Sequence, residues 1–236
     1  MNKIIIFLAS VIAGLTLNAC DDDNNLPDIV PSEHGAVTDN EGNTYNWVRI
    51  GDLLWTTSNA NNGPLMDNYR YYDNTEWKNA FSKNEKAWLQ EEYHPVYGNL
   101  MTWDDAMESA PEGWRVPTDE DWQKLERQLG MENTADRGWR GENGVGRKMQ
   151  EKDTGCRLAL MLGGFITVVP SGYAWIEMEL DFTDEYGAFW TSTLTDSNPD
   201  HKTAYYRKVH CSNGGVDREA GRCDKLMSVR WCRNAQ

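Results

Sequence analysis

Residues 111–122 decide the fold and read Pro-Glu-Gly-Trp-Arg-Val-Pro-Thr-Asp-Glu-Asp-Trp. The second proline ends the extended segment before it, because a residue that precedes proline is disfavoured in the helical conformation. Thr118 and Asp121 then have the spacing of a capping box, in which two side chains satisfy the first free amide groups of a helix. The stretch therefore predicts a strand that passes directly into a helix, with Trp114 and Trp122 packed against each other.

Local signals predict two short helices. Trp122, Leu125 and Leu129 recur on one helical face after the capping box, and Gly130 is a natural stop. A second capping box at residues 102–105 predicts the other helix.

The remaining pattern predicts short strands and long loops. Turn residues at 39–43 lie between residues 37–38 and the alternating segment 44–51, which predicts a β-hairpin. Apolar segments lie around 158–169 and 188–194, and the last strands are expected at 203–211 and 226–233. Eleven tryptophans and ten tyrosines predict an aromatic core. We expect one compact α+β domain over residues 35–236, with mostly antiparallel strands.

The N-terminus has the form of an export signal. A charged start is followed by an apolar run from Ile4 to Leu17, which at 14 residues is shorter than the ~20 that span a bilayer. Ala19 then precedes Cys20, as in the lipobox of bacterial lipoproteins. We expect residues 1–19 to be removed and Cys20 to be lipidated. The alternative is an ordinary signal peptide cut near Ala19, with Cys20 left over.

Residues 20–34 are predicted to form a disordered tether, because they contain few apolar side chains to bury. Asp21, Asp22 and Asp23 follow the lipidated cysteine. These acids are either a solvated spacer or, by resemblance, the surface-export signal of Bacteroidetes lipoproteins. The second interpretation predicts a protein anchored in the outer membrane and exposed at the cell surface, with the membrane as its first partner.

The net charge and the number of cysteines narrow the range of functions and compartments that fit this chain. A net charge of −14 argues against nucleic-acid binding, because an acidic chain repels phosphates. Four cysteines remain after Cys20, an even number that fits an oxidising compartment. Three pairings are possible. We favour Cys211–Cys223 across a hairpin and Cys156–Cys232 between the core and the last strand.

Several spaced motifs together resemble the Fibrobacter succinogenes major paralogous domain (FISUMP), which occurs in exported proteins of Bacteroidetes and Fibrobacteres. The matching residues, in chain order, are Asp39, Gly42-Asn43, Tyr45, Val48, Ile50-Gly51, Trp55, Asn59, Leu100–Trp103, Ala106-Met107, Pro111–Thr118, Asp121-Trp122, Leu125, Leu162–Gly164, Gly187–Ser192, Ala204–Arg207 and Ser228–Arg230. Some of these are also similar to C-type-lectin-like folds and to the formylglycine-generating-enzyme family. The resemblance implies a compact α+β domain whose N- and C-terminal strands pair.

Two departures from the family concern its disulfide. The family often has a cysteine where this chain has Ser109-Ala110, and another directly after Val-Arg, where Trp231 stands and Cys232 follows. A shift of one residue in a strand turns the side chain to the other face, so the usual disulfide of the family is not expected.

The sequence favours binding over catalysis. The four histidines have no metal-ligand spacing, and we expect no metal and no cofactor. The late cysteines are 12 and 9 residues apart, unlike the close pair of the formylglycine-generating enzymes, which leaves that enzyme class as a remote alternative.

Exposed tryptophans could instead stack on a ligand. Trp77, Trp88, Trp139 and Trp175 lie outside the family motifs and are the candidates. Each could also simply cover a loop. We therefore expect a non-catalytic adhesion module for a glycan or for extracellular matrix. The alternative is a structural component of a surface or fimbria-like assembly that binds envelope proteins.

Overall fold

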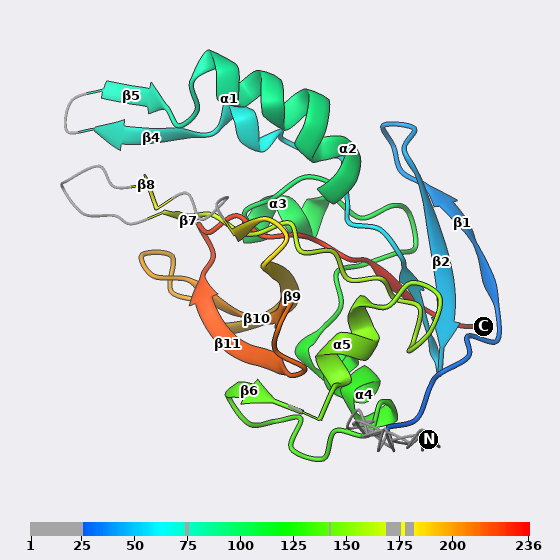
Figure 1. Cartoon of the computed structure of the whole chain (residues 1–236). Coiled ribbons are helices and arrows are strands. Elements are labelled where there is room, and N and C mark those ends of the chain that lie inside the picture. The colour runs from blue at the N-terminus through cyan, green and yellow to red at the C-terminus, as the bar shows by residue number, and fades with distance from the viewer. Residues whose placement is uncertain (1–25, 74–75, 142, 169–175, 178–181) are drawn as a thin grey trace, which may run out of the picture.

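The computed structural model describes residues 26–236 except 74–75, 142, 169–175 and 178–181 (Figure 1). The signal peptide, Cys20 and the three aspartates therefore lie outside the described residues. Among the described residues, no helix is long and apolar enough to cross a membrane.

The first sheet contains both ends of the domain. Its strand order is β1-β2-β3-β12, formed by β1 (His34–Thr38), β2 (Thr44–Ile50), β3 (Leu53–Thr56) and β12 (Cys232–Asn234), all antiparallel. The predicted hairpin is confirmed. Asp39 closes its turn, because its carboxylate accepts hydrogen bonds from the amides of Glu41 and Asn43 and from the hydroxyl of Tyr45. The C-terminal strand pairs within the N-terminal sheet, as the resemblance implies.

The second sheet is also antiparallel, with strand order β6-β11-β10-β9. Its strands are β6 (Gly138–Arg140), β11 (Val216–Arg222), β10 (Thr203–His210) and β9 (Tyr186–Asp196). The sequence predicts a strand over residues 226–233. In the structure only the last two of these residues, Cys232 and Arg233, belong to a strand, which is β12. Met227 and Ser228 instead make isolated bridges to Met101 and Phe189.

Two hairpins complete the strands. They are β4 (Arg70–Asp73) with β5 (Glu76–Asn79), and β7 (Thr167–Val168) with β8 (Ile176–Glu177).

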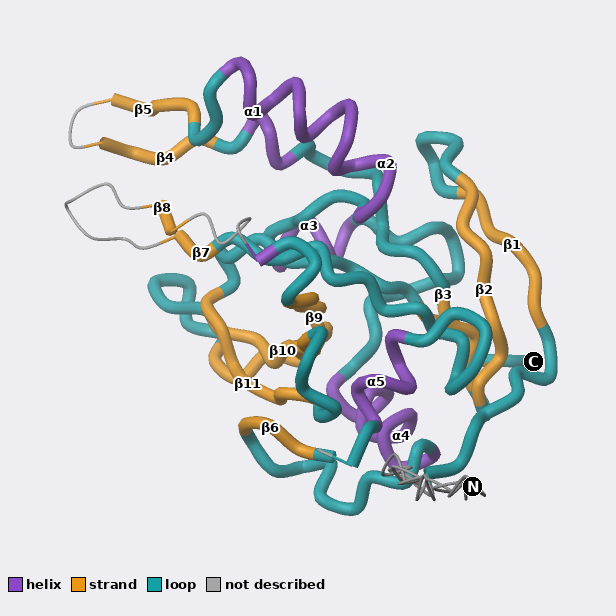
Figure 2. The backbone as a smooth tube through the Cα atoms, viewed as in Figure 1, coloured by secondary structure: helices purple, strands orange, loops and turns teal. Residues whose placement is uncertain are grey.

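The two predicted helices are present, but the expected number of helices is too low. α3 (Trp103–Glu108) is capped by Thr102, and α4 (Asp119–Gln128) begins with the Thr118–Asp121 capping box. The additional helical elements are η1 (Met66–Asn68), α1 (Lys83–Trp88), the π-helix η2 (Leu89–Tyr93), α2 (His94–Tyr97) and α5 (Val145–Gln150). α1, η2 and α2 follow one another as a single arm (Figure 2).

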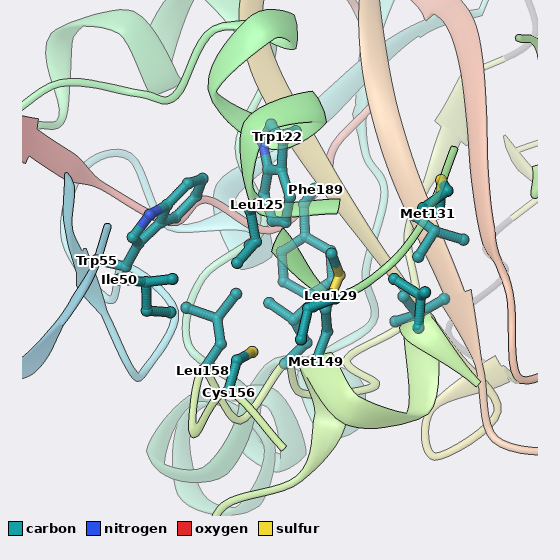
Figure 3. Close-up of a cluster of buried hydrophobic side chains, with 14 of the residues drawn as sticks. Ile50, Trp55, Trp122, Leu125, Leu129, Met131, Met149, Cys156, Leu158 and Phe189 are labelled. Carbon is teal, nitrogen blue, oxygen red and sulfur yellow. The ribbon is translucent and has the colours of Figure 1, made fainter. Parts of the chain in front are cut away.

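Two large apolar clusters lie on either side of the second sheet and share β9. The first cluster surrounds Trp122, whose ring centroid is 5.1 Å from that of Trp55 and 6.1 Å from that of Phe189 (Figure 3). Trp114 belongs to the second cluster, with Trp190 and Trp231, so the predicted pair of Trp114 with Trp122 is wrong. The segment before α4 is extended, and Trp114 and Val116 therefore share the face that points into the second cluster.

A buried ionic network fixes α4 to the second sheet. Asp119 accepts hydrogen bonds from Arg207 of β10 and Arg218 of β11, at 2.7 to 2.9 Å. Glu126 accepts from Arg207 at 2.6 Å and from Arg140 of β6 at 2.7 Å. Arg207 and Arg218 are direct cross-strand partners, a repulsive pair that Asp119 neutralises from the helix.

The N-terminal segment is docked on the domain from Leu26 onward. The amide of Ile29 donates to the carbonyl of Gly155 at 3.0 Å, and Asp28 pairs with Lys148 of α5. Leu26 and Ile29 also pack against the first cluster. The prediction of a disordered tether over residues 20–34 is therefore wrong for residues 26–34, because these two side chains have apolar area to bury.

Candidate functional site

The structure describes the side chains of two of the four candidate tryptophans, and it places Trp88 and Trp139 on different elements, α1 and β6. Trp139 lies half-buried in β6. Trp88 ends α1 with 37% of its surface exposed, and its ring lies against Tyr93 at 5.6 Å. Trp77 lies in β5, but its side chain is outside the described part of the chain, as is the whole of Trp175. Of the two that are described, Trp139 lines one of the hollows below.

That hollow, here called the sheet hollow, opens at the edge of the second sheet and measures about 510 Å³. Its lining residues are Trp139 of β6, Tyr186 of β9, His210 of β10, and Ser212, Asn213 and Gly214 of the β10–β11 turn. Two half-buried aromatic side chains from different strands thus flank a turn that carries hydroxyl and amide groups.

A row of cross-strand partners lies beside the sheet hollow. Trp139 is opposite Asp217, and Asp217 is opposite Lys208, so the three side chains share one face of the sheet. The ammonium of Lys208 lies 3.3 Å from Asp217 Oδ2, 5.8 Å from the ring centroid of Trp139 and 5.5 Å from that of Tyr186. A cation between two aromatic rings is a stabilising arrangement.

Asp217 retains unused hydrogen-bonding capacity. Its residue is only 4% exposed, and Oδ1 has no hydrogen-bond partner among the described residues. A buried carboxylate oxygen without a partner costs free energy, which the ion pair of Oδ2 with Lys208 partly offsets.

The turn of the sheet hollow is held by its own side chains. Nδ1 of His210 accepts from the amide of Ser212 at 3.1 Å. The ring of His210 lies 4.3 Å from that of Tyr186. Asn213 Oδ1 accepts from the amide of Gly215 at 2.8 Å. These contacts position the hollow before any ligand arrives.

A second polar cleft of about 240 Å³ lies between α2, the β1–β2 turn and the loop after β3. We call it the His94 cleft. Asn59 and Asn61 line it, with Tyr45 and Val96. His94 is 7% exposed, and its Nε2 has no hydrogen-bond partner among the described residues. Burial lowers the pKa of His94, against a smaller opposing effect of Asp67, so the ring is neutral at neutral pH.

A third hollow, about 790 Å³, lies over α4 and β12. Its basic side chains are mostly engaged already. Arg115 pairs with Asp121, and Arg127 pairs with Glu120, each at 2.5 Å.

The four remaining cysteines are free thiols in this structure. Cys211–Cys223 is incompatible with the register of the β10–β11 hairpin. Cys223 lies opposite Lys202, nine residues from Cys211 along β10, a distance of roughly 30 Å at the rise of a β-strand. Cys156 and Cys232 lie in the same cluster, and their pairing stays a prediction.

The buried thiols are poor nucleophiles. Burial raises the pKa of Cys156 and of Cys232 to about 12 and that of Cys223 to about 11, so that all three are protonated at neutral pH. Within the described ranges, no group of three or more histidine, cysteine, aspartate or glutamate side chains could hold a metal ion.

The sequence pattern singles out Trp139 as a candidate site residue. It does not point to its neighbours Tyr186, Lys208 and Asp217. Alternation along β10 could have placed Lys208 and His210 on one face. The partners across the sheet depend on the register of three strand pairs, for which the chain carries no local signal.

The chain forms a compact α+β domain. It has two antiparallel sheets packed around buried tryptophans, several short helices, and a hollow lined by aromatic residues beside the second sheet. The chain belongs to the Fibrobacter succinogenes major domain family, whose profile matches residues 48–233. No curated protein and no solved structure gives a significant match.

Proposed function

We propose that this chain is a lipid-anchored, non-catalytic binding protein of the outer membrane, displayed at the cell surface, and that its sheet hollow binds a saccharide. The observation that carries the proposal is the pair Trp139 and Tyr186 beside the Lys208–Asp217 row. Aromatic faces suit the apolar faces of sugar rings, while charged and amide groups bond their hydroxyls.

Asp217 does not line the hollow itself, but its ion pair with Lys208 holds the ammonium group beside the rings of Trp139 and Tyr186. Ser212 and Asn213 supply further donors and acceptors at the rim. We also propose a C-type-lectin-like arrangement, which the pairing of the C-terminal strand within the N-terminal sheet supports.

Binding is tested with purified domain and a panel of polysaccharides, by calorimetry and by tryptophan fluorescence. We expect Trp139→Ala to weaken binding at least tenfold, a loss of about 1.4 kcal/mol that one stacked ring can supply. Trp88→Ala is the matched control, since Trp88 is exposed on another element, and it should bind like the unmodified domain. If no polysaccharide binds while crosslinking on cells captures one envelope protein, the assembly role replaces the saccharide role.

The anchor is tested separately with Cys20→Ala. The proposal expects the variant to lose membrane fractionation and its acyl mass. A variant that still fractionates with membranes and stays protease-accessible on whole cells would show that Cys20 is not the anchor.

A further inference from the structure

The docked N-terminal segment has a consequence for how the domain meets the membrane. Resting on the proposed lipid anchor at Cys20, we infer that residues 26–30 hold the domain with its α4–α5 end against the lipid headgroups. The α1–α2 arm and the His94 cleft then face away from the bilayer.

Three kinds of contact fix this segment. Leu26 and Ile29 pack against the first apolar cluster, Asp28 pairs with Lys148 of α5, and the amide of Ile29 donates to Gly155. Just beyond the segment, the amide of Arg49 donates to the carbonyl of Glu33 at 2.8 Å, and the two side chains form an ion pair. The segment is thus attached before it enters β1.

The length of chain between Cys20 and the docked segment limits how far the domain can turn. From Cys20 to Leu26 there are six residue steps, which reach at most about 20 Å. A domain of this size is about 40 Å across. If residues 26–33 were undocked, the reach from Cys20 to His34 would be at most about 48 Å. With the segment docked, the connection is therefore too short for the far end of the domain to reach the lipid.

The docked segment and the α1–α2 arm lie at opposite ends of the molecule. Leu26 lies beside Gly130, directly after α4, and the N-terminal end of the described chain lies near α4 in Figure 1. The α1–α2 arm and the β4–β5 hairpin occupy the other end of the same view. Val96 on this arm is 51% exposed, which makes it a usable reporter position.

The sheet hollow lies nearer to the anchored end. Gln150 of α5 donates to the carbonyl of His210, which lines the hollow, and Lys148 two residues earlier holds Asp28. A saccharide in the sheet hollow is consequently held close to the bilayer. This position favours saccharide chains rooted in the same membrane over a distant matrix.

The experiment uses the lipidated full chain reconstituted in vesicles that contain a dye-labelled lipid. A donor dye is attached through Gln128→Cys at the end of α4 or through Val96→Cys on α2, each with Cys211→Ser to remove the exposed thiol. We expect strong energy transfer to the lipid dye from position 128 and weak transfer from position 96. Equal transfer from the two positions would overturn the inference.

Two further variants show whether the docked segment is the cause. Asp28→Ala combined with Ile29→Gly should abolish the difference between the two positions, whereas Val30→Gly, at a residue that is 73% exposed, should preserve it. A difference that survives the double variant would also overturn the inference. Failure of the anchor itself is distinguishable, because the chain would then lack the acyl mass on Cys20 and would not bind vesicles.

Discussion

Arg230 illustrates how single residues in this domain stabilise loops. It is completely buried, and its guanidinium donates to Asn59 Oδ1 and to the carbonyls of Thr56, Leu158 and Ala159, at 2.6 to 2.9 Å. Burial lowers its pKa to about 9, which still leaves the group charged at neutral pH. Ala159 has a φ of 52°, a left-handed conformation that costs energy in a residue with a Cβ. Arg230 holds this strained loop in place.

The thiols give a prediction at the same scale. With Cys20 replaced by serine, iodoacetamide should modify one cysteine of the native protein, the exposed Cys211, and four after unfolding. The physical reason is that burial removes reagent access and raises the pKa of the other three thiols. Mass spectrometry counts the adducts. Only two adducts after unfolding would instead indicate one disulfide, such as Cys156–Cys232.

Asp119 makes the domain sensitive to acid. Burial raises its pKa, but hydrogen bonds and charges from Arg218 and Arg207 outweigh that effect and lower the pKa to about 2. A carboxyl whose pKa is lower in the folded chain than its ordinary 3.8 adds stability above pH 4. That contribution is lost as the pH falls toward 2.

We therefore expect the free energy of unfolding to fall between pH 4 and pH 2, with Asp119 contributing on the order of 2 kcal/mol. Asp119→Asn should be less stable at pH 7 and should show a smaller acid-dependent loss. Urea titrations at several pH values measure both effects. Part of the loss should remain in the variant, since the pKa values of Asp39 and Asp121 are lowered as well. An unchanged acid profile in Asp119→Asn would contradict this assignment.

At the scale of elements, the end of α2 depends on Gly98. Its φ is +76°, and a Cβ there would lie 2.6 Å from the carbonyl oxygen of Ala60. We expect Gly98→Ala to lower stability by more than about 2 kcal/mol, from backbone strain together with this clash. Gly42→Ala is the control, because its φ is also positive at +91° but no atom lies within 4 Å of the added Cβ.

The control should cost only about 1 kcal/mol. Thermal unfolding measures the loss of stability in Gly98→Ala and in Gly42→Ala. Equal losses would mean that the loop at Ala60 moves aside, and that the close approach of α2 is not required.

Elements with local signals could be predicted from the sequence, and elements without them could not. The β1–β2 hairpin and α4 carry turn and capping residues within a few positions of one another. α1 buries no side chain and so lacks apolar periodicity, although Ser82 and Glu85 form a capping box that would have revealed it. β11 reads Val-Asp-Arg-Glu-Ala-Gly-Arg and has little apolar character. Its charged residues have partners in the folded chain: Arg218 pairs with Asp119, Asp217 with Lys208, and Glu219 with Arg137. A strand that is stabilised by ion pairs carries no hydrophobic pattern by which the sequence could reveal it.

The candidate site was predictable only in part for the same reason. Trp139 could be singled out because it lies outside the family motifs. Its neighbours Tyr186 and Asp217 are 47 and 78 residues away in the chain, and only the strand order β6-β11-β10-β9 brings them together. Non-local register of this kind is set by the packing of the whole domain.

For the whole molecule, Arg207 is the residue that joins α4 to the second sheet. Arg207→Leu would leave Asp119 and Glu126 buried with fewer partners, and we expect a loss of about 3–5 kcal/mol. Arg222→Leu is the matched control on the neighbouring strand, since its pair with Asp224 is partly exposed and should be worth at most about 1 kcal/mol. Chemical denaturation compares the two. Similar losses would show that the buried network adds little to the fold.

If the proposed lipid anchor and saccharide site are correct, the docked segment also bears on how the protein responds to mechanical load. A pull between the lipid and a bound saccharide would then enter the domain at residues 26–33, ahead of the β1–β2 ladder. Undocking these eight residues would lengthen the tether by roughly 25 Å before any strand is loaded. The docked segment would thus let the chain extend under brief tension while both sheets stay folded.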